Sequence, residues 1–438
     1  MSRYFAMTMH FSPSSGPQLS LRMPRVMDWT HLLWNYARIG NLIAIQKMFA
    51  EGRASPYDVN PHGSNALTYA VGYRPNIVRF LLQQGAEADL PNQAGRTASE
   101  MFWEHSFAGR LGSEGASTFG SFFEDGDYVQ TRRFTTLHKA VLGIIHKDLG
   151  AELELSTAEI NARDTRGRTP LCWAVIRDDL SAVRILLTFG ANPNILDDLG
   201  HTALHFVRSV GICKLLLDAK VDVHARNAYY GRTALHPYGG RTREIKVVDM
   251  LIQAGIDVDA RDADGETPLM NAIYYTLTPM AHRLLELGAN VNATNWSNKY
   301  SPLHFAAEFD EYTIMPALLE KGADYTAQNK YGRTIAHLAA RYAGTHTLSI
   351  LAKANLDRLD ATLRDKGGKT ATEYLIERCI SLDIDQGVRD EFHKLLELRM
   401  HSKQCQPGEH SCHPELRASH DLDKEIHLPG AYPLNDGS

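Results

Sequence analysis

Five histidines stand at the same place in a phrase that this 438-residue sequence repeats, and histidine is a common metal ligand. They are His138, His205, His236, His304 and His337. A zinc ion needs its histidine ligands within about 2.0–2.1 Å. Successive units of a helical repeat lie about 10 Å apart. We therefore expect these histidines to have a structural role rather than to share a metal ion.

The C-terminal region contains a second set of residues that could bind zinc, namely Cys405, His410, Cys412 and His413. Their spacing matches no paired zinc-finger pattern, so we expect no metal there. The glycines of 106–126 do not form a phosphate-binding loop of the Gly-x-x-x-x-Gly-Lys-Ser/Thr kind.

The sequence also offers no pair or triad of catalytic groups, since no Ser-His-Asp or Cys-His arrangement follows from the spacing. Asp197, Asp198 and Asp262 lie at junctions between repeats, where carboxylates usually accept hydrogen bonds from turn backbone groups. The sequence thus predicts no catalytic residue, cofactor or metal, and no enzyme activity.

The elements that position these residues are set by the repeated phrase. It reads Gly-His-Thr-Ala-Leu-His at 200–205 and Gly-Glu-Thr-Pro-Leu-Met at 265–270. Its Thr or Ser recurs every 31 to 34 residues, at positions 169, 202, 233, 267, 301 and 334. A second phrase, Leu-Leu-x-x-Gly-Ala, follows at 186–191, 284–289 and 318–323. A fixed step of this length indicates one supersecondary unit stacked many times.

The residues of 164–197 show what one unit must be. Thr169 is suited to cap a helix that begins with Pro170, where no N–H is needed. Apolar residues at helical spacing follow, and a second helix begins at Leu180. Gly190 is suited to the left-handed residue that ends it. Two such short helices bury too little surface to fold alone, so the units must stack.

Together the two phrases and their step resemble the ankyrin repeat family. The resemblance implies an all-α solenoid of helix–turn–helix units with a hairpin-like finger at each junction. It also implies that protein partners bind on the concave side, formed by first helices and fingertips, and that the histidines hydrogen-bond between neighbouring turns.

Applied to the whole chain, the pattern predicts about eleven units, some degenerate. Residues 1–27 alternate with period two and predict an N-terminal β-hairpin cap. Weaker repeats follow in 28–105, then a Gly/Ser/Phe-rich inserted loop in 106–133, the main array in 134–400 with a C-terminal capping helix, and a disordered tail in 401–438.

Three units of the main array depart from the pattern. Pro237 falls where a first helix should continue, and proline inside a helix costs about 3 kcal/mol, so this unit should be short or distorted. The unit at 200–227 is shortened between its helices. In the unit that begins at Thr135, Leu149-Gly150 stands where a second helix should stop.

Composition narrows the classes of partner. The net charge is −5, which gives no general attraction to nucleic acid or an anionic membrane. No apolar run is long enough to span a bilayer, and no secretory signal is expected in 1–16. The five cysteines are scattered, which fits a reducing cytoplasm or nucleus.

Aromatic residues gather at the variable positions of 263–365. The candidate partner-binding residues are Tyr274, Tyr275, Phe309 and Tyr342 near the ends of first helices, and Trp296, Tyr300 and Tyr331 at fingertips. Aromatic residues dominate binding hot spots because they bury a large area with few torsions. The basic residues before the Thr, such as Arg168, Arg232 and Arg333, are expected to form a basic edge or a solvated surface.

These observations predict a non-catalytic protein-interaction scaffold, either a monomeric array or part of a larger assembly. The alternative is an adaptor or substrate receptor in an enzyme complex such as a ubiquitin ligase, docked through the N-terminal hairpin or the inserted loop. An enzyme would need polar groups converging on a pocket, which the sequence does not indicate.

Overall fold

The computed structural model of the protein describes residues 6–12, 16–22, 24–27, 31–71, 74–93, 95–107, 132–237, 243–354, 356–360, 362–381 and 386–401. Most of the predicted inserted loop and all but the first residue of the predicted tail therefore lie outside the described residues.

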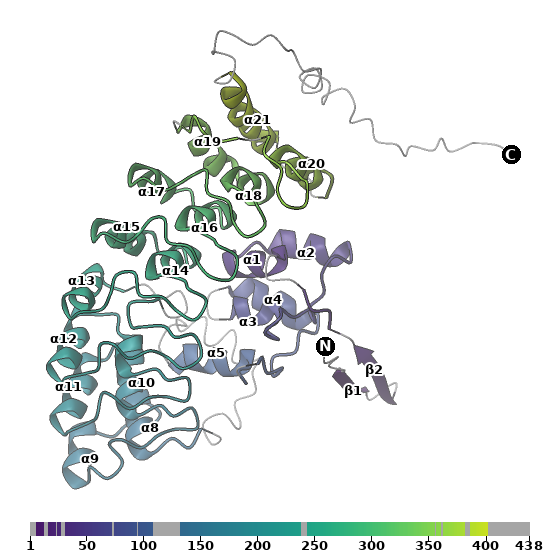
Figure 1. The fold of residues 1–438 in the computed structure, drawn as a ribbon. Coiled ribbons are helices and arrows are strands. Elements are labelled where there is room, and N and C mark those ends of the chain that lie inside the picture. Colours follow the sequence, from purple (N-terminus) through teal and green to yellow (C-terminus); the bar gives the residue numbers. More distant parts are fainter. Residues whose placement is uncertain are drawn as a thin grey trace.

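Residues 132–401, which we name the main array, form two layers of short helices that stack into an arc (Figure 1). The inner layer contains α8 (Thr136–Leu142), α10 (Pro170–Arg177), η1 (Ala203–Phe206), α14 (Pro268–Tyr274), α16 (Pro302–Glu308), α18 (Ile335–Tyr342) and α20 (Ala371–Ser381). The outer layer contains α9 (Leu149–Leu155), α11 (Leu180–Thr188), α12 (Val210–Asp218), α13 (Ile245–Gln253), α15 (Thr278–Glu286), α17 (Met315–Glu320), α19 (Thr345–Lys353) and α21 (Gln386–His401).

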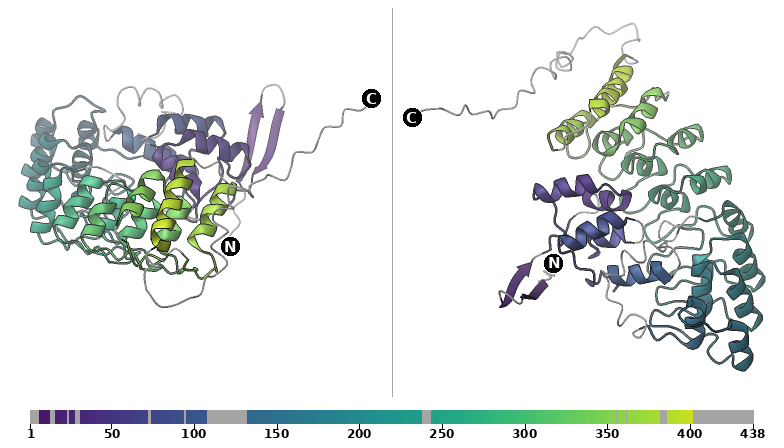
Figure 2. Two further views of the ribbon diagram at one scale, coloured as in Figure 1. Left: turned by 90° about the horizontal axis from the view of Figure 1, so that it is seen from above. Right: turned by 180° about the vertical axis from the view of Figure 1, so that it is seen from behind.

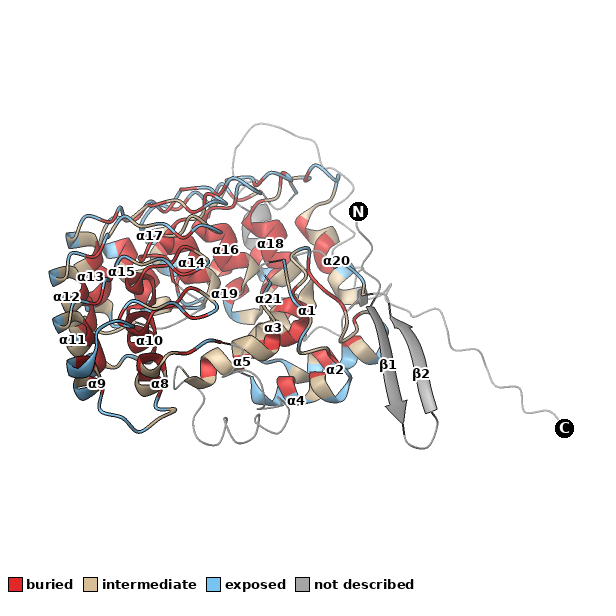
Figure 3. Cartoon of the chain, turned by 90° about the horizontal axis from the view of Figure 1, so that it is seen from below, coloured by how far each residue is buried: buried red, intermediate tan, exposed pale blue. Residues whose placement is uncertain are grey.

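The local signals of the repeated phrases explain these helices. The side chain of Thr169 accepts a hydrogen bond from the backbone N–H of Cys172, and Pro170 opens α10. Gly190 follows the outer helix with φ +88°, a left-handed conformation that favours glycine. Every residue of α10 from Pro170 to Ile176 is buried, and Figure 3 shows the same burial along much of the inner layer. The inner helices thus form the core of the array.

Residues 31–107, which we name the N-terminal block, contain a shorter array of the same design. Its helices are α1 (Leu32–Ile39), α2 (Leu42–Ala50), α3 (Ala66–Ala70), α4 (Pro75–Gln83) and α5 (Ala98–Phe107). The block has its own hydrophobic core, distinct from that of the main array. The views of Figures 1 and 2 place it on the concave side of the arc.

Strand β1 (Ala6–Ser12) pairs antiparallel with β2 (Gly16–Arg22), and Ala6 lies opposite Arg22. The hairpin lies outside the helical layers (Figure 1). The segment that follows it contacts the first unit, because Arg25 forms an ion pair with Asp58 at 2.8 Å and Val26 pairs with Val59.

In the unit that contains Pro237, the described residues 234–236 form a turn where the inner helix should begin, which agrees with the predicted distortion. The unit at 200–227 has only the 3-10 helix η1 in its inner layer. One prediction was wrong: Leu149-Gly150 does not end a helix but begins α9. The reason is that the side chain of Asp148 caps α9 by accepting a hydrogen bond from the N–H of Ala151 at 2.7 Å.

Candidate protein-binding surface

Hairpin-like fingers join the units, and their tips are linked by a ladder of backbone hydrogen bonds. Each link runs from an N–H of one fingertip to a carbonyl oxygen of the preceding one. The N–H groups of Asp198, Ala228, Ala263, Trp296, Lys330 and Lys366 donate over 2.7–2.9 Å to the carbonyls of Arg166, Leu199, Tyr230, Asp264, Asn298 and Tyr331 respectively. The fingertips therefore form a row whose backbone is held in place before any partner binds.

An Asp or Asn closes each finger from inside. The Asp197 carboxylate accepts hydrogen bonds from the N–H groups of Leu199 (3.0 Å) and His201 (2.8 Å). Asp262 does the same for Asp264 and Glu266, which confirms the expected turn role of both aspartates. Asp198 differs, because it is exposed and forms an ion pair with Arg163 at 2.9 Å.

The repeated histidines link neighbouring units, as the family resemblance implies. The Nε2 atoms of His138, His205, His236 and His337 lie 3.0–3.3 Å from carbonyl oxygens of the next unit. Burial lowers the pKa of His205 to about 4 and that of His236 to about 3, so both rings are neutral near pH 7. Among the described residues, no group of three or more His, Cys, Asp or Glu side chains is arranged to hold a metal ion.

The arginines before the Thr are neither a basic edge nor a solvated surface, contrary to prediction. Each pairs with the finger carboxylate of the next unit: Arg232 Nε lies 3.0 Å from Asp262, and Arg333 Nε lies 3.0 Å from Asp365. Arg168 is buried with 3% of its surface exposed. A signal for this pairing existed in the sequence, where an Arg before the Thr precedes an Asp one unit later.

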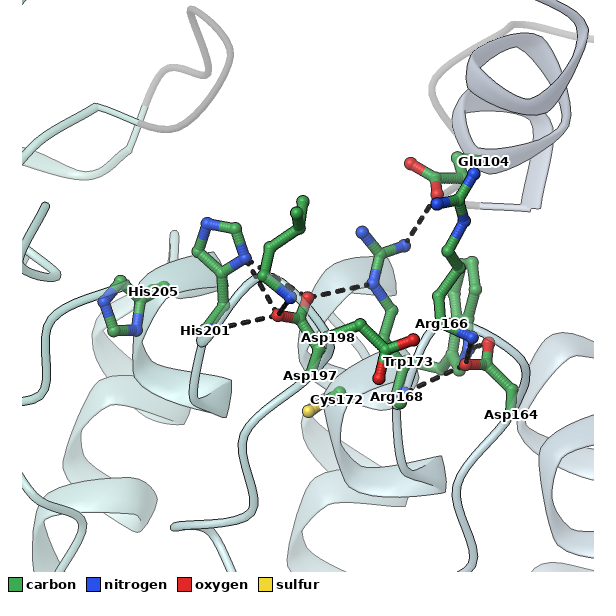
Figure 4. A network of polar contacts seen from close by, with 12 residues as sticks. Glu104, Asp164, Arg166, Arg168, Cys172, Trp173, Asp197, Asp198, His201 and His205 are labelled. Atoms are coloured by element: carbon green, nitrogen blue, oxygen red, sulfur yellow. Dashed lines mark hydrogen bonds and ion pairs between the residues drawn. The ribbon is translucent and has the colours of Figure 1, made fainter. Parts of the chain in front are cut away.

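Arg168 also connects the main array to the N-terminal block (Figure 4). Its guanidinium lies between Asp197, at 3.5 Å, and Glu104 of α5, at 3.2 Å. Arg132 at 3.1 Å and Arg96 at 2.6 Å also pair with Glu104. Burial alone would raise the pKa of Glu104, but the three arginines outweigh it and hold this pKa far below its ordinary value. Glu104 is thus a buried, charged anchor.

Further contacts extend the docking of the N-terminal block along the concave side. Near α10, Arg166 forms an ion pair with Glu100, and its guanidinium donates to the carbonyl oxygen of Gly95 at 2.9 Å. Far along the arc, Arg38 of α1 donates to the carbonyl oxygen of Tyr274 at 2.9 Å. The block therefore runs antiparallel to the main array, with α5 beside its beginning and α1 beside its later units.

The predicted concave residues Tyr274, Tyr275, Phe309 and Tyr342 are half-buried and pack against the core of the main array. The Arg38 guanidinium carbon lies 5.4 Å from the ring centroid of Tyr274 and 5.5 Å from that of Phe309. The sequence indicates an open groove here, whereas Arg38 of the chain's own N-terminal block lies against the rings of Tyr274 and Phe309. Their role in binding a partner stays a prediction.

The fingertip residues divide into two kinds. Trp296 is 64% exposed and Tyr331 is 46% exposed. Tyr300 is not a fingertip residue, contrary to prediction: it is 4% exposed and its ring stacks on His304 with centroids 5.5 Å apart. The reason is its place directly before the helix-capping Ser301, where the chain has already turned inward.

Within the described residue ranges, no helix is both long enough and apolar enough to cross a lipid bilayer.

Comparison with known proteins agrees with this architecture. The family described as ankyrin repeats (3 copies) matches residues 137–227, 207–295 and 237–329. The B-cell lymphoma 3 protein homolog of Mus musculus is 35% identical over 223 residues, which are 48% of this chain and 47% of that protein. Ankyrin repeat and SOCS box protein 16 of Homo sapiens is 29% identical over 296 residues, 63% of this chain and 60% of that protein.

Among solved structures, the ankyrin repeat domain of Bcl-3 is 33% identical and has a TM-score of 0.41; the match covers 48% of this chain and 95% of that one. The chain spans about half the length of the curated B-cell lymphoma 3 relative (47%), and the assignment rests on the sequence matches. On the family match, the sequence identity to these relatives and the repeated unit described above, the chain belongs to the ankyrin repeat family.

Proposed function

We propose that this chain is a non-catalytic protein-binding module of the cytoplasm or nucleus, and that its partner engages the fingertip face. Ankyrin repeats indicate protein–protein interaction. The observation that carries the choice of face is the difference in exposure: Arg38 of the N-terminal block contacts the concave rings of Tyr274 and Phe309, while Trp296 and Tyr331 are 64% and 46% exposed. Exposed aromatic residues on a rigid backbone are typical anchors of an interface.

The test uses two variants of the full chain, each with several substitutions. Each variant is used to purify its partners from a lysate of its native cells, and the partners are identified by mass spectrometry. The first variant replaces the fingertip rings by Trp296→Ala and Tyr331→Ala. The second replaces concave rings by Tyr275→Ala, Phe309→Ala and Tyr342→Ala. We expect only the fingertip variant to lose partners at unchanged folding of the main array.

Loss of partners by the concave variant alone would show that the partner displaces the N-terminal block, and would contradict the choice of face. Retention of every partner by both variants would contradict both surfaces. Circular dichroism of each variant separates these results from unfolding.

The adaptor alternative is favoured by one feature, the hairpin β1–β2 that stands outside the helical layers. The relative from Homo sapiens is named for ankyrin repeats together with a SOCS box. If the hairpin docks this chain into a ubiquitin ligase, deletion of residues 6–22 removes ligase subunits from the purified material and leaves the fingertip partners in place.

A further inference from the structure

One edge of the fingertip row is both aromatic and basic. Its members, which we name the fingertip edge, come from three consecutive fingers and are all exposed: Trp296, Lys299, Lys330, Tyr331 and Lys366. The backbone ladder fixes them, since the N–H of Lys330 donates to Asn298 at 2.8 Å and that of Lys366 donates to Tyr331 at 2.9 Å. The edge is therefore a preorganised surface, which lowers the entropy lost on binding.

The charge of this edge opposes that of the whole chain, which is −5. Asp262, in the finger before the edge, and Asp365, in the finger of Lys366, are buried, accept backbone hydrogen bonds and pair with arginines. These carboxylates are thus engaged inside the fingers. Asp264 is exposed at one end of the edge, next to Trp296. The three lysines remain as a row of positive charge that favours an acidic partner.

The aromatic rings lie close to the finger backbone. Gly265 has φ +76°, and a Cβ atom at this position would lie 2.6 Å from ring atoms of Trp296. The indole ring therefore rests against the glycine and still exposes 64% of its residue surface. Tyr331 is backed by the guanidinium of Arg333, 5.3 Å from its ring centroid. Flat, supported rings of this kind bind extended or proline-rich segments.

The spacing between stacked units indicates which kind of partner segment fits the fingertip edge. Stacked units are separated by about 10 Å. A polyproline II segment advances about 3.1 Å per residue with three residues per turn, so residues i, i+3 and i+6 share one face at about 9 Å intervals. Carboxylates at every third residue would each meet one lysine of the fingertip edge, and prolines between them would contact Trp296 and Tyr331.

We propose that the fingertip edge docks an extended acidic segment of a partner protein, with a carboxylate at every third residue and proline or other apolar residues between. This inference rests on the proposed protein-binding function and names the chemistry of the partner.

The probe is a fluorescein-labelled (Glu-Pro-Pro)5 peptide, titrated with the full chain and followed by fluorescence anisotropy. We expect saturable binding that weakens as salt rises, because exposed charges are screened. The triple variant Lys299→Gln, Lys330→Gln and Lys366→Gln should bind at least tenfold more weakly, and so should Trp296→Ala. The matched control Lys214→Gln, Lys246→Gln and Lys321→Gln changes the net charge equally at exposed outer-layer positions and should bind like the unmodified chain.

Two further probes make the result specific. A (Gln-Pro-Pro)5 peptide should not bind, and a peptide of the same composition with its glutamates in one block should bind more weakly. The proposal is overturned if (Glu-Pro-Pro)5 does not bind, or if both lysine triples weaken it equally. It is also overturned if single-stranded DNA or phosphatidylserine vesicles bind more tightly through the same lysines. Should the peptide fail while Trp296→Ala with Tyr331→Ala still loses cellular partners, the proposed function stands and the acidic chemistry is wrong.

Discussion

In four units the repeated histidine (His138, His205, His236 or His337) links two units, and its protonation state sets how strongly it can do so. His205 is 4% exposed, and burial, with the nearby charge of His201, lowers its pKa from 6.5 to about 4. The unfolded chain therefore takes up this proton first as the pH falls. The stability that neutral His205 provides is complete above pH 6.5 and is lost as the pH falls toward 4.

The variant His205→Met tests this pH dependence, since Met270 occupies the same position in another unit and its sulfur accepts from Thr267 at 3.5 Å. Each unit of pKa depression corresponds to about 1.4 kcal/mol. We expect the variant to be less stable than the unmodified chain at pH 7, because it loses the hydrogen bond to the Arg232 carbonyl. Between pH 6.5 and pH 4 its stability should fall by less than that of the unmodified chain. Urea denaturation midpoints measure both. The exposed control His146→Met should keep the original slope, and an unchanged slope in His205→Met would refute the assignment.

At the scale of one element, the unit with a turn in place of an inner helix is supported by the side chain of Arg243. The Arg243 guanidinium donates to the carbonyl oxygens of Ala234 at 2.7 Å and His236 at 3.5 Å. These carbonyls would otherwise lie in the first turn of a helix. Burial lowers the pKa of Arg243 to about 10, so the group stays charged at neutral pH. Arg243 thus substitutes for the missing helical hydrogen bonds.

The variant Arg243→Met keeps the apolar length of the side chain and removes its donors. An unsatisfied buried carbonyl costs about 1–3 kcal/mol, and we expect a loss of that size in the free energy of unfolding. Lys246→Ala, at an exposed position in the first turn of α13 just after Arg243, should change the free energy of unfolding by less than about 0.5 kcal/mol. Equal losses in the two variants would mean that Arg243 does not support this unit.

Helix α5 is held to the main array by Glu104, whose side chain is 13% exposed and pairs with three arginines. Glu104→Gln leaves Arg132 buried without the carboxylate it pairs with and leaves Arg168 with Asp197 alone, so we expect a loss of about 3 kcal/mol in the free energy of unfolding. Because the folded-state pKa of Glu104 is depressed, its contribution is complete above the ordinary carboxyl pKa and disappears as the solution becomes more acidic.

Urea denaturation of Glu104→Gln at pH 7 measures this loss. The control is Glu100→Gln on the same helix. The ion pair that this variant removes is more exposed, because 27% of the Glu100 side chain and 23% of the Arg166 side chain are exposed. Glu100→Gln should lower the free energy of unfolding by about 1 kcal/mol or less. A smaller effect for Glu104→Gln than for Glu100→Gln would contradict the anchoring role.

At the scale of the whole molecule, the sequence predicts the structural features that recur from unit to unit, because each recurrence leaves a similar local pattern of residues. The capping Thr169, the glycine at 190 and the linking histidines follow from a step of 31 to 34 residues, and so does the distortion at Pro237. Contacts such as Arg38 with Tyr274, 236 residues apart, leave no periodic signal. The sequence therefore predicted the array but not its covered concave side, and Tyr300 was misplaced because a single residue decides whether a finger has turned inward.

The central claim is that the N-terminal block covers the concave side of the main array, which leaves the exposed fingertip rings of Trp296 and Tyr331 to an external partner. The full chain with Arg166→Lys, treated with a carbodiimide that joins carboxylates to touching amines, tests it most directly. We predict an amide between residues 100 and 166 within one chain, identified by mass spectrometry and abolished by adding Glu100→Gln. Lys147 and Glu152, paired at 2.8 Å, serve as the internal control. If 147–152 is cross-linked while 100–166 is not, the concave side is open and the account is contradicted.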